Sequence, residues 1–266
     1  MSKVPARRTA VAASLISLSL ALTACGSDGG EDAKKDAKAD AKSSPSAAVS
    51  AAPAAPVSKT LTQADLEKLL VTEADLKGHH FKSPAPDEIP EPGSTVTDKP
   101  NCQALAMALT EGAPSVASAV AMRGVAPIPQ ATSAPSGPSK EEQVADALAR
   151  MSIVLTTLSS HVGTGAEDAM ADLKKAATTC ATGLTVFSSA DDTSKYSKIV
   201  PVAYDAGDEA LAYTTKVVRK EASENADIHL VVVRKGSTIA TFTTSLLGDK
   251  AKPSKAIVDA QLKKLG

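Results

Sequence analysis

The chain has 266 residues, and its 29 Lys and Arg against 30 Asp and Glu leave a formal net charge of -1. A nucleic-acid partner would need a surplus of basic residues to neutralise phosphates, and this balance supplies none. Three Phe, three Tyr and no Trp leave few aromatic rings for stacking bases or sugars. We therefore expect no nucleic-acid partner.

The first 24 residues have the pattern of a secretory signal peptide. Lys3, Arg7 and Arg8 precede an apolar stretch from Val11 to Leu22, which is too short to span a bilayer. We predict a signal peptide over residues 1–24. The residues after Arg8 lack the bulky apolar pair of a twin-arginine signal, so general secretion is the expected route and twin-arginine export the alternative.

The segment Leu22-Thr23-Ala24-Cys25 resembles the lipobox of bacterial lipoproteins. An aliphatic residue stands three positions before a cysteine, with small residues between them. The resemblance implies that the Cys25 thiol carries a diacylglyceryl group and that cleavage occurs before it; the alternative is a buried or disulfide-bonded Cys25. Two acyl chains hold a protein stably at a membrane. We expect a lipid-anchored protein on the outer face of the cytoplasmic membrane, facing the cell wall.

A linker is predicted between the lipidated cysteine and the folded part, over residues 25–59. Gly26–Lys59 contains ten Ala, ten charged residues and six Ser, and its only larger apolar residues are Val49 and Val57. Such a composition cannot bury a core, so we expect a disordered tether. As a flexible coil it would reach on the order of 30 Å. The remaining residues, 60–266, have the length of one domain.

Helices are predicted in the first half of this domain. Thr62 is placed to cap a helix with an apolar stripe at Leu66, Leu69 and Leu70, and a short turn follows from Thr72 to Gly78. Two long Pro-rich stretches, over residues 84–100 and 123–140, are functional loops or disordered segments, with disorder favoured by their polar composition.

Two further helices are expected at capping signals. Asn101 is an N-cap candidate for a helix over Cys102–Leu109, and Thr164–Glu167 has the spacing of a capping box that begins a second helix. A third candidate, Lys140–Arg150, runs into the β-branched segment Met151–Ser159, which also fits a strand, so this boundary stays open.

The second half changes to the period of β-strands. Residues 211–215 alternate, Ile228–Val233 is almost continuously apolar, and Thr238–Ser245 follows across the Lys235-Gly236 turn. A final amphipathic helix is predicted after Pro253. Helices followed by strands predict an α+β fold, a single domain in which a twisted antiparallel sheet is flanked by α-helices.

The cysteine count suggests one disulfide. With Cys25 assigned to lipid, Cys102 and Cys180 remain as a pair in an oxidising compartment. We predict that they are bridged; the alternative is two free thiols. The bridge would tie the first helices to the helix that ends at Cys180.

Three segments, Tyr204–Tyr213, Val231–Ser237 and Ala260–Leu262, resemble the second half of the PknH-like extracellular sensor domain. That domain occurs in actinobacterial envelope lipoproteins and outside certain receptor serine/threonine kinases. The resemblance implies a twisted antiparallel sheet flanked by helices, with a cleft for an unidentified ligand. Family members with two disulfides have four domain cysteines, whereas this chain has two, so one bridge is missing.

Few residues point to metal or cofactor chemistry. His79-His80 stands near Asp87, Glu88 and Glu91, but without the spacing of metal ligands, so we expect a solvated loop and no metal. No cofactor is predicted either.

Two further sites were weighed. His161 precedes Gly163-Thr164-Gly165, a weak similarity to a dinucleotide-binding loop, but Glu167 and Asp168 would repel a phosphate there. Asp208-Glu209 could form a carboxylate pair, yet consecutive strand residues face opposite ways, and a turn role is expected. His229 is expected to be an exposed or satisfied strand residue.

Three functional hypotheses are compatible with this sequence. The first is a non-catalytic extracytoplasmic ligand-binding or sensing module, held to the membrane by its lipid, with an unidentified small-molecule, lipid or cell-wall ligand. The second is an envelope carrier or scaffold for an apolar molecule or a protein, which a large apolar cavity or patch would favour. The third is a hydrolase, for which His161 or His229 would have to meet a carboxylate and a Ser or Thr in a cleft. Ligand-binding residues cannot be named from the sequence.

Overall fold

The computed structural model describes residues 60–128, 152–187, 193–219, 226–247 and 255–266. The predicted signal peptide, Cys25, the linker, the helix candidate over Lys140–Arg150 and Pro253 lie outside them. Within the described ranges, no helix has both the length and the apolar character needed to cross a bilayer.

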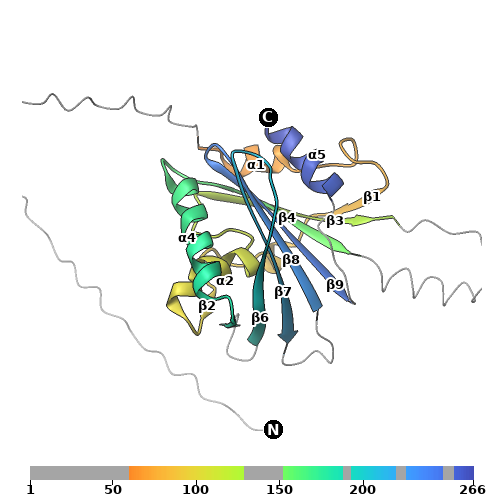
Figure 1. Cartoon of the computed structure of the whole chain (residues 1–266). Coiled ribbons are helices and arrows are strands. Elements are labelled where there is room, and N and C mark those ends of the chain that lie inside the picture. The colour runs from red at the N-terminus through yellow and green to blue at the C-terminus, as the bar shows by residue number, and fades with distance from the viewer. Residues whose placement is uncertain (1–59, 129–151, 188–192, 220–225, 248–254) are drawn as a thin grey trace, which may run out of the picture. The chain divides into compact units, whose positions relative to one another are not determined.

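The described strands form one antiparallel sheet of nine strands, in the spatial order β1-β3-β4-β9-β8-β7-β6-β5-β2 (Figure 1). Together with the helices this confirms the predicted α+β class. The strands are β1 (His79–Lys82), β2 (Val96–Thr97), β3 (Ala119–Pro127), β4 (Ile153–Ser160), β5 (Gly183–Phe187), β6 (Thr193–Val202), β7 (Glu209–Arg219), β8 (Ala226–Lys235) and β9 (Thr238–Leu247).

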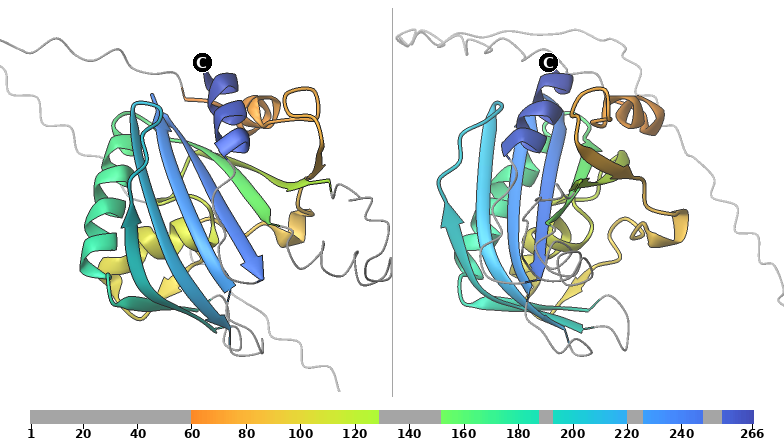
Figure 2. Two further views of the ribbon diagram at one scale, coloured as in Figure 1. Left: turned by 45° about the vertical axis from the view of Figure 1, so that its right-hand side comes forward. Right: turned by 90° about the vertical axis from the view of Figure 1, so that its right-hand side faces the viewer.

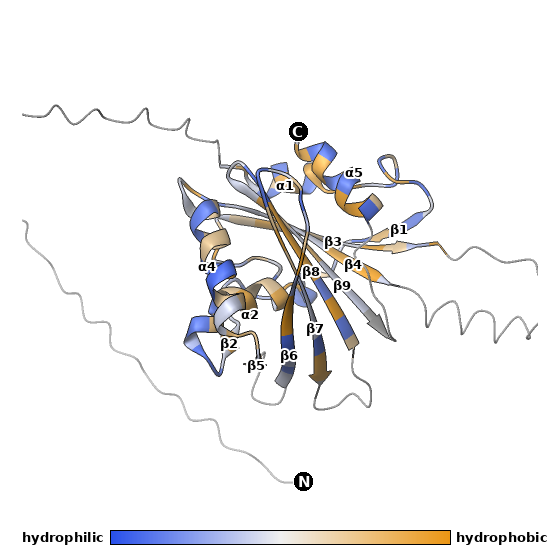
Figure 3. Cartoon of the chain, viewed as in Figure 1, coloured by the Kyte–Doolittle hydropathy of each residue, from blue (hydrophilic) through white to orange (hydrophobic). Residues whose placement is uncertain are grey.

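Helices pack on both faces of the sheet. The α-helices of the described residues are α1 (Gln63–Leu69), α2 (Gln103–Thr110), α4 (Gly165–Thr179) and α5 (Lys255–Leu265), and two short 3-10 helices are η1 (Pro86–Glu88) and η2 (Pro100–Cys102). Figure 2 shows α2 and α4 against one face, and α1 and α5 together at one end of the other. Both α4 and α5 carry hydrophobic and hydrophilic residues on different sides (Figure 3), as their amphipathic pattern requires.

The strand β8 is buried on both faces, because it lies in the middle of the sheet. Leu230 and Val232 belong to the core beneath α2 and α4, whereas Val231 and Val233 belong to the core beneath α1 and α5. This explains why its sequence is almost continuously apolar instead of alternating.

The core under α2 and α4 is joined by the predicted disulfide. Cys102 and Cys180 are bridged, both are fully buried, and their Cα atoms are 6.0 Å apart. Cys102 immediately precedes α2 and Cys180 immediately follows α4, so the bridge holds the two helices of this layer together.

The predicted cap of α1 is confirmed, and the cap predicted for α2 is wrong. At α4, Thr164 is the N-cap residue as predicted, but it forms no capping box. Thr62 and Asp65 form a capping box at α1. The helix expected over Cys102–Leu109 is α2, but Pro100 starts a 3-10 turn, so Cys102 and not Asn101 precedes it, without a side-chain cap. At α4, the Thr164 hydroxyl donates to Asp168 (2.9 Å) instead of accepting from the backbone.

Several strands lie where loops were expected. The first Pro-rich stretch contains η1 and β2, and the second begins inside β3. His79-His80 is not on a solvated loop: both residues lie in β1, which pairs with β3. In the segment Met151–Ser159, where the sequence left the boundary between helix and strand undecided, the structure has the strand β4, which begins at Ile153 and ends at Ser160.

Candidate functional site

An open depression with a volume of about 410 Å³ lies on the sheet over β6, β7 and β8. The depression lies on the same face of the sheet as α1 and α5 (Figure 2). These helices cover the end of that face near the β8–β9 turn, and the depression lies toward the opposite end. Eight residues line it: Ser197, Lys198, Val200, Thr214, Thr215, Lys216, Asp227 and His229. Three adjacent strands therefore supply one polar site.

A β-bulge in β6 shapes this depression. Ser197 pairs with Lys216 and Val200 with Thr214, so β6 contains one residue more than β7 between these pairs. Lys198 lies within this bulge and has a φ of 48°. This left-handed backbone conformation costs a non-glycine residue roughly 1–2 kcal/mol. Such strain is concentrated at functional sites, and here it lies at the rim of this depression.

Hydrogen bonds brace the bulge from both strands. The Thr215 hydroxyl donates to the Ser197 carbonyl oxygen (2.8 Å), and the Ser197 hydroxyl donates to the Lys216 carbonyl oxygen (3.4 Å). Lys216 Nζ lies 3.2 Å from Asp227 Oδ1 across β7 and β8. The floor of the depression is thus tied to its neighbours at three points.

The charge of the lining is weakly positive at neutral pH. Lys198 and Lys216 each carry one positive charge, and Asp227 carries one negative charge. Burial lowers the pKa of His229 below its ordinary value of 6.5, although the charge of Asp227 opposes the shift, so the imidazole is neutral at pH 7. The lining therefore has a net charge of about +1, with hydroxyl and imidazole groups available for hydrogen bonds.

Of this lining, sequence reasoning singled out His229 alone, as a strand residue and as a candidate for the hydrolase hypothesis. The depression does bring His229 together with Asp227 and with the hydroxyls of Ser197, Thr214 and Thr215. Among the described residues, however, no hydrogen bond joins the His229 imidazole to any of these hydroxyls.

A usable signal for this site existed in β6, where the buried residues Tyr196 and Ile199 are three positions apart instead of two. A break in strict alternation indicates a bulge. Ser197, Lys198 and Val200 flank that break.

His161 meets a serine, but in the protein interior. The Ser159 hydroxyl lies 3.1 Å from His161 Nε2, and both side chains are buried. Burial also lowers the pKa of His161. Among the described residues, no carboxylate lies within ion-pair distance of this imidazole, so the three groups that the hydrolase hypothesis needs do not converge there.

The other weighed residues have local partners. His79 Nδ1 lies 3.0 Å from the carbonyl oxygen of Lys77, and Glu88 lies 3.7 Å from Lys82. Within the described part of the chain, no group of three or more His, Cys, Asp or Glu is placed to hold a metal ion.

Asp208 has the expected turn role. It accepts a hydrogen bond from the Gly236 amide (2.7 Å). Asp208 and Glu209 both lie near Arg234, at 3.6 and 3.7 Å, and Glu167 approaches the same guanidinium at 3.7 Å. Arg234 thus balances carboxylates from α4 and from the start of β7.

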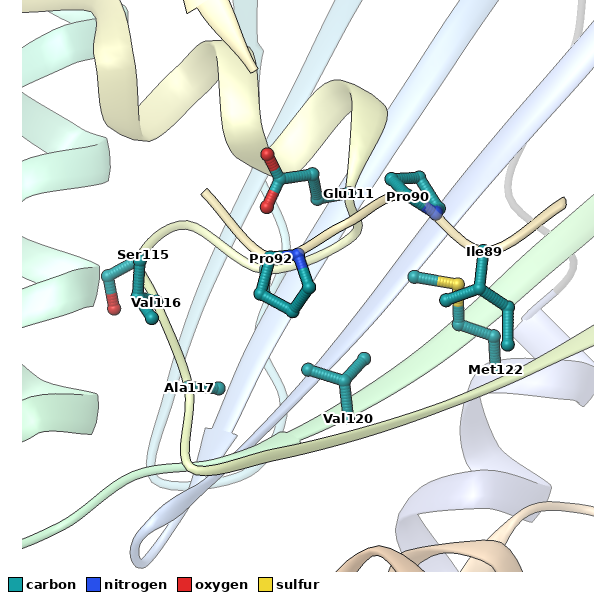
Figure 4. Close-up of a pocket in the computed structure, with 10 residues that line it drawn as sticks. Ile89, Pro90, Pro92, Glu111, Ser115, Val116, Ala117, Val120 and Met122 are labelled. Carbon is teal, nitrogen blue, oxygen red and sulfur yellow. The ribbon is translucent and has the colours of Figure 1, made fainter. Parts of the chain in front are cut away.

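A second, apolar pocket lies between β3 and the loops beside it (Figure 4). Its volume is about 30 Å³, far below that of a lipid chain or a drug-sized molecule. The buried Glu111 carboxylate at its edge accepts hydrogen bonds from the Gly93 and Thr95 amides (2.8 and 2.9 Å). This carboxylate holds a loop in place.

Comparisons with known proteins give a likeness among solved structures but none among family models or curated proteins. No family model matches the chain, and no curated protein matches it. Among solved structures it is similar to the extracellular domain of PknH from Mycobacterium tuberculosis, with a TM-score of 0.44 and 10% identity, covering 78% of this chain and 96% of that chain. The α+β assignment itself rests on the strands and helices described above.

Proposed function

We propose that this protein is a lipid-anchored, non-catalytic binding module of the cell envelope, which holds a small ligand in the depression over β6, β7 and β8. The depression carries the proposal: it has the volume of a small-molecule site, polar groups from three strands and a strained residue at its rim. The signal-peptide pattern and Cys25 support an anchor on the outer face of the cytoplasmic membrane, facing the cell wall.

The disulfide supports the same compartment. Bridged cysteines persist in oxidising surroundings outside the cytoplasm, and Cys102–Cys180 joins the two helices of one layer.

Ser159 and His161 are buried, so a substrate cannot reach a nucleophile there. At His229, the neighbouring hydroxyls of Thr215 and Ser197 donate to backbone carbonyl oxygens, and Asp227 pairs with Lys216. These partners favour binding over hydrolysis in the depression. The small volume of the apolar pocket gives no support to a carrier of apolar molecules.

Native mass spectrometry tests the binding role. The predicted mature chain without its lipidated Cys25, residues 26–266, is exported behind a cleavable secretion signal so that the disulfide can form. We expect a retained small molecule in the parent protein and its loss in Thr214→Trp, whose indole would fill the depression. Val218→Trp is the matched control, because Val218 is exposed on the same strand but does not line the depression.

A mass without adduct in the parent, both before and after incubation with envelope extract, would contradict the binding role. Retention of the same molecule by Thr214→Trp would place the ligand elsewhere. The anchor is tested separately by metabolic labelling of the full chain with a fatty-acid analogue. Label is expected in the parent and absent in Cys25→Ser; equal label in both would refute the anchor.

A further inference from the structure

The two lysines of the depression differ in what surrounds them. Lys216 is held by Asp227, with 3.2 Å between Nζ and Oδ1. Lys198 is exposed and is the residue that the bulge forces into the left-handed region. Among the described residues no ion pair neutralises Lys198, so one positive charge stands uncompensated at the rim.

An apolar surface adjoins these charges. Val200 lines the depression and is 38% exposed, and Val202, two residues further along β6, is 44% exposed. Val200 pairs with Thr214 and Val202 with Ala212, so both valines belong to the same face of β6. Charge and exposed apolar surface therefore lie next to each other on one face of the sheet.

The donors around the charges fit an acceptor. Lysine ammonium groups donate hydrogen bonds and accept none, and the Thr214 hydroxyl can also donate. A net lining charge of about +1 balances one negative charge on a ligand. Two negative charges would leave an excess beside Asp227.

We infer that the depression binds a small amphiphile whose single anionic group pairs with Lys198 and Lys216 and whose apolar portion lies on Val200 and Val202. This inference rests on the proposed function, since it names the ligand class of the same site. A cation would meet two ammonium groups, and a purely polar anion would leave the valines exposed to water.

Hexanoate is a suitable probe, because it combines one carboxylate with a short alkyl chain. It is titrated into ¹⁵N-labelled residues 26–266, and backbone amide shifts locate the bound probe. We expect saturable shifts at Val200, Thr214 and His229, and binding that weakens as salt is raised. Acetate lacks the alkyl chain, whereas hexanol and hexylamine lack the anion, so all three should bind more weakly.

Charge variants then test the two lysines. Lys198→Asn removes the charge and keeps a residue that tolerates the left-handed region, so folding should be preserved. It should weaken hexanoate binding about three- to fivefold, as expected for one exposed ion pair. Lys216→Gln should weaken it at least as much, because Asp227 is then unpaired. Lys174→Gln on α4 removes a charge from an exposed helix side chain and should change nothing.

The outcomes separate this inference from the proposed function. Equal binding of hexanol and hexanoate would overturn the anionic group but leave a binding site in the depression. Tighter binding of hexylamine, shifts confined to other strands, equal weakening by Lys174→Gln, or no binding of any probe would also overturn the inference. Failure of the proposed function itself would appear as the absence of a retained molecule in the mass spectra.

Discussion

The side-chain amide of Gln261 forms a hydrogen bond with the backbone of Val71, 190 residues earlier in the chain. Its Oε1 atom accepts from the Val71 N–H (2.8 Å), and its Nε2 atom donates to the Leu69 carbonyl oxygen (2.7 Å). Gln261 is fully buried in α5. The two bonds satisfy backbone groups at the end of α1 that the helix cannot pair internally.

Replacing Gln261 by Leu should therefore be costly although leucine is apolar and similar in size. The Val71 N–H and the Leu69 carbonyl would be left without partners, at about 1–3 kcal/mol each. We expect the free energy of unfolding in urea to fall by about 3 kcal/mol. Gln63→Leu is the control, because the described partner of the Gln63 amide is the exposed Glu67, and loss of this bond should cost less than about 0.5 kcal/mol. Equal losses in the two variants would contradict this role of Gln261.

Gly207 and Gly163 form a matched pair for a second prediction. Both have positive φ, 62° and 59°, but a Cβ atom at Gly207 would lie 2.5 Å from Val233 Cγ1 and 2.6 Å from the Arg234 carbonyl oxygen. At Gly163 the same atom would meet nothing within 4 Å. Gly207 therefore combines backbone strain with a steric clash, and Gly163 has strain alone.

Gly207→Ala should lower the free energy of unfolding by about 3 kcal/mol, and Gly163→Ala by about 1 kcal/mol. Thermal and urea unfolding of the two variants measure the difference. The clash would also displace the neighbouring Asp208, whose carboxylate accepts a hydrogen bond from the Gly236 amide in the β8–β9 turn. If the two substitutions cost the same, β8 accommodates the methyl group and the close approach has no energetic role.

A strand of this fold could be predicted from the sequence only where its segment is long enough to show a hydrophobic periodicity. The sequence predicted β8 at Ile228–Val233 and β9 at Thr238–Ser245, because burial in the sheet requires apolar and β-branched residues there. β1 and β2, with four and two residues, are too short to show one, and their pairing is decided by β3 and β5. Tertiary pairing, and not local preference, produces these edge strands.

The candidate site was harder to predict than the core. Lys198, Lys216 and Asp227 look like ordinary solvated strand residues, and they become one site only through the register of β6, β7 and β8. The disulfide, by contrast, followed from counting, because only two cysteines remained after Cys25. The resemblance to the PknH-like family stays a prediction.

Removal of the disulfide should destabilise the domain without changing its fold. The bridge spans 78 positions between Cys102 and Cys180, and the chain-entropy model assigns such a loop about 4–5 kcal/mol. We expect the double variant Cys102→Ala, Cys180→Ala to lose about this amount in urea unfolding, with part of the loss due to the vacated core volume.

The parent protein measured with and without a reductant separates these two contributions, because reduction opens the loop and keeps the sulfur atoms. The reduced parent should be less stable than the oxidised parent and more stable than the double variant. Equal stability of the oxidised and reduced forms would show that the bridge does not restrict the unfolded chain.

The buried His161 should make the domain less stable in mild acid. Burial lowers the pKa of His161 below its ordinary value of 6.5, so on acidification the unfolded chain takes up the proton before the folded protein does. The unfolded state then binds more protons, and the free energy of unfolding decreases as the pH falls through 6.5. His229 contributes with the same sign, because burial lowers its pKa as well.

Urea unfolding at intervals between about pH 7.5 and 5.5 measures this slope. We expect His161→Gln to flatten it, whatever stability the variant loses at neutral pH through its contact with Ser159. His229→Gln should flatten it further, and the double variant should show the smallest slope. Because the slope and the stability at neutral pH are independent readouts, a variant that only loosens the core would lower the curve without flattening it. An unchanged slope in both single variants would show that other groups control the acid sensitivity of this domain.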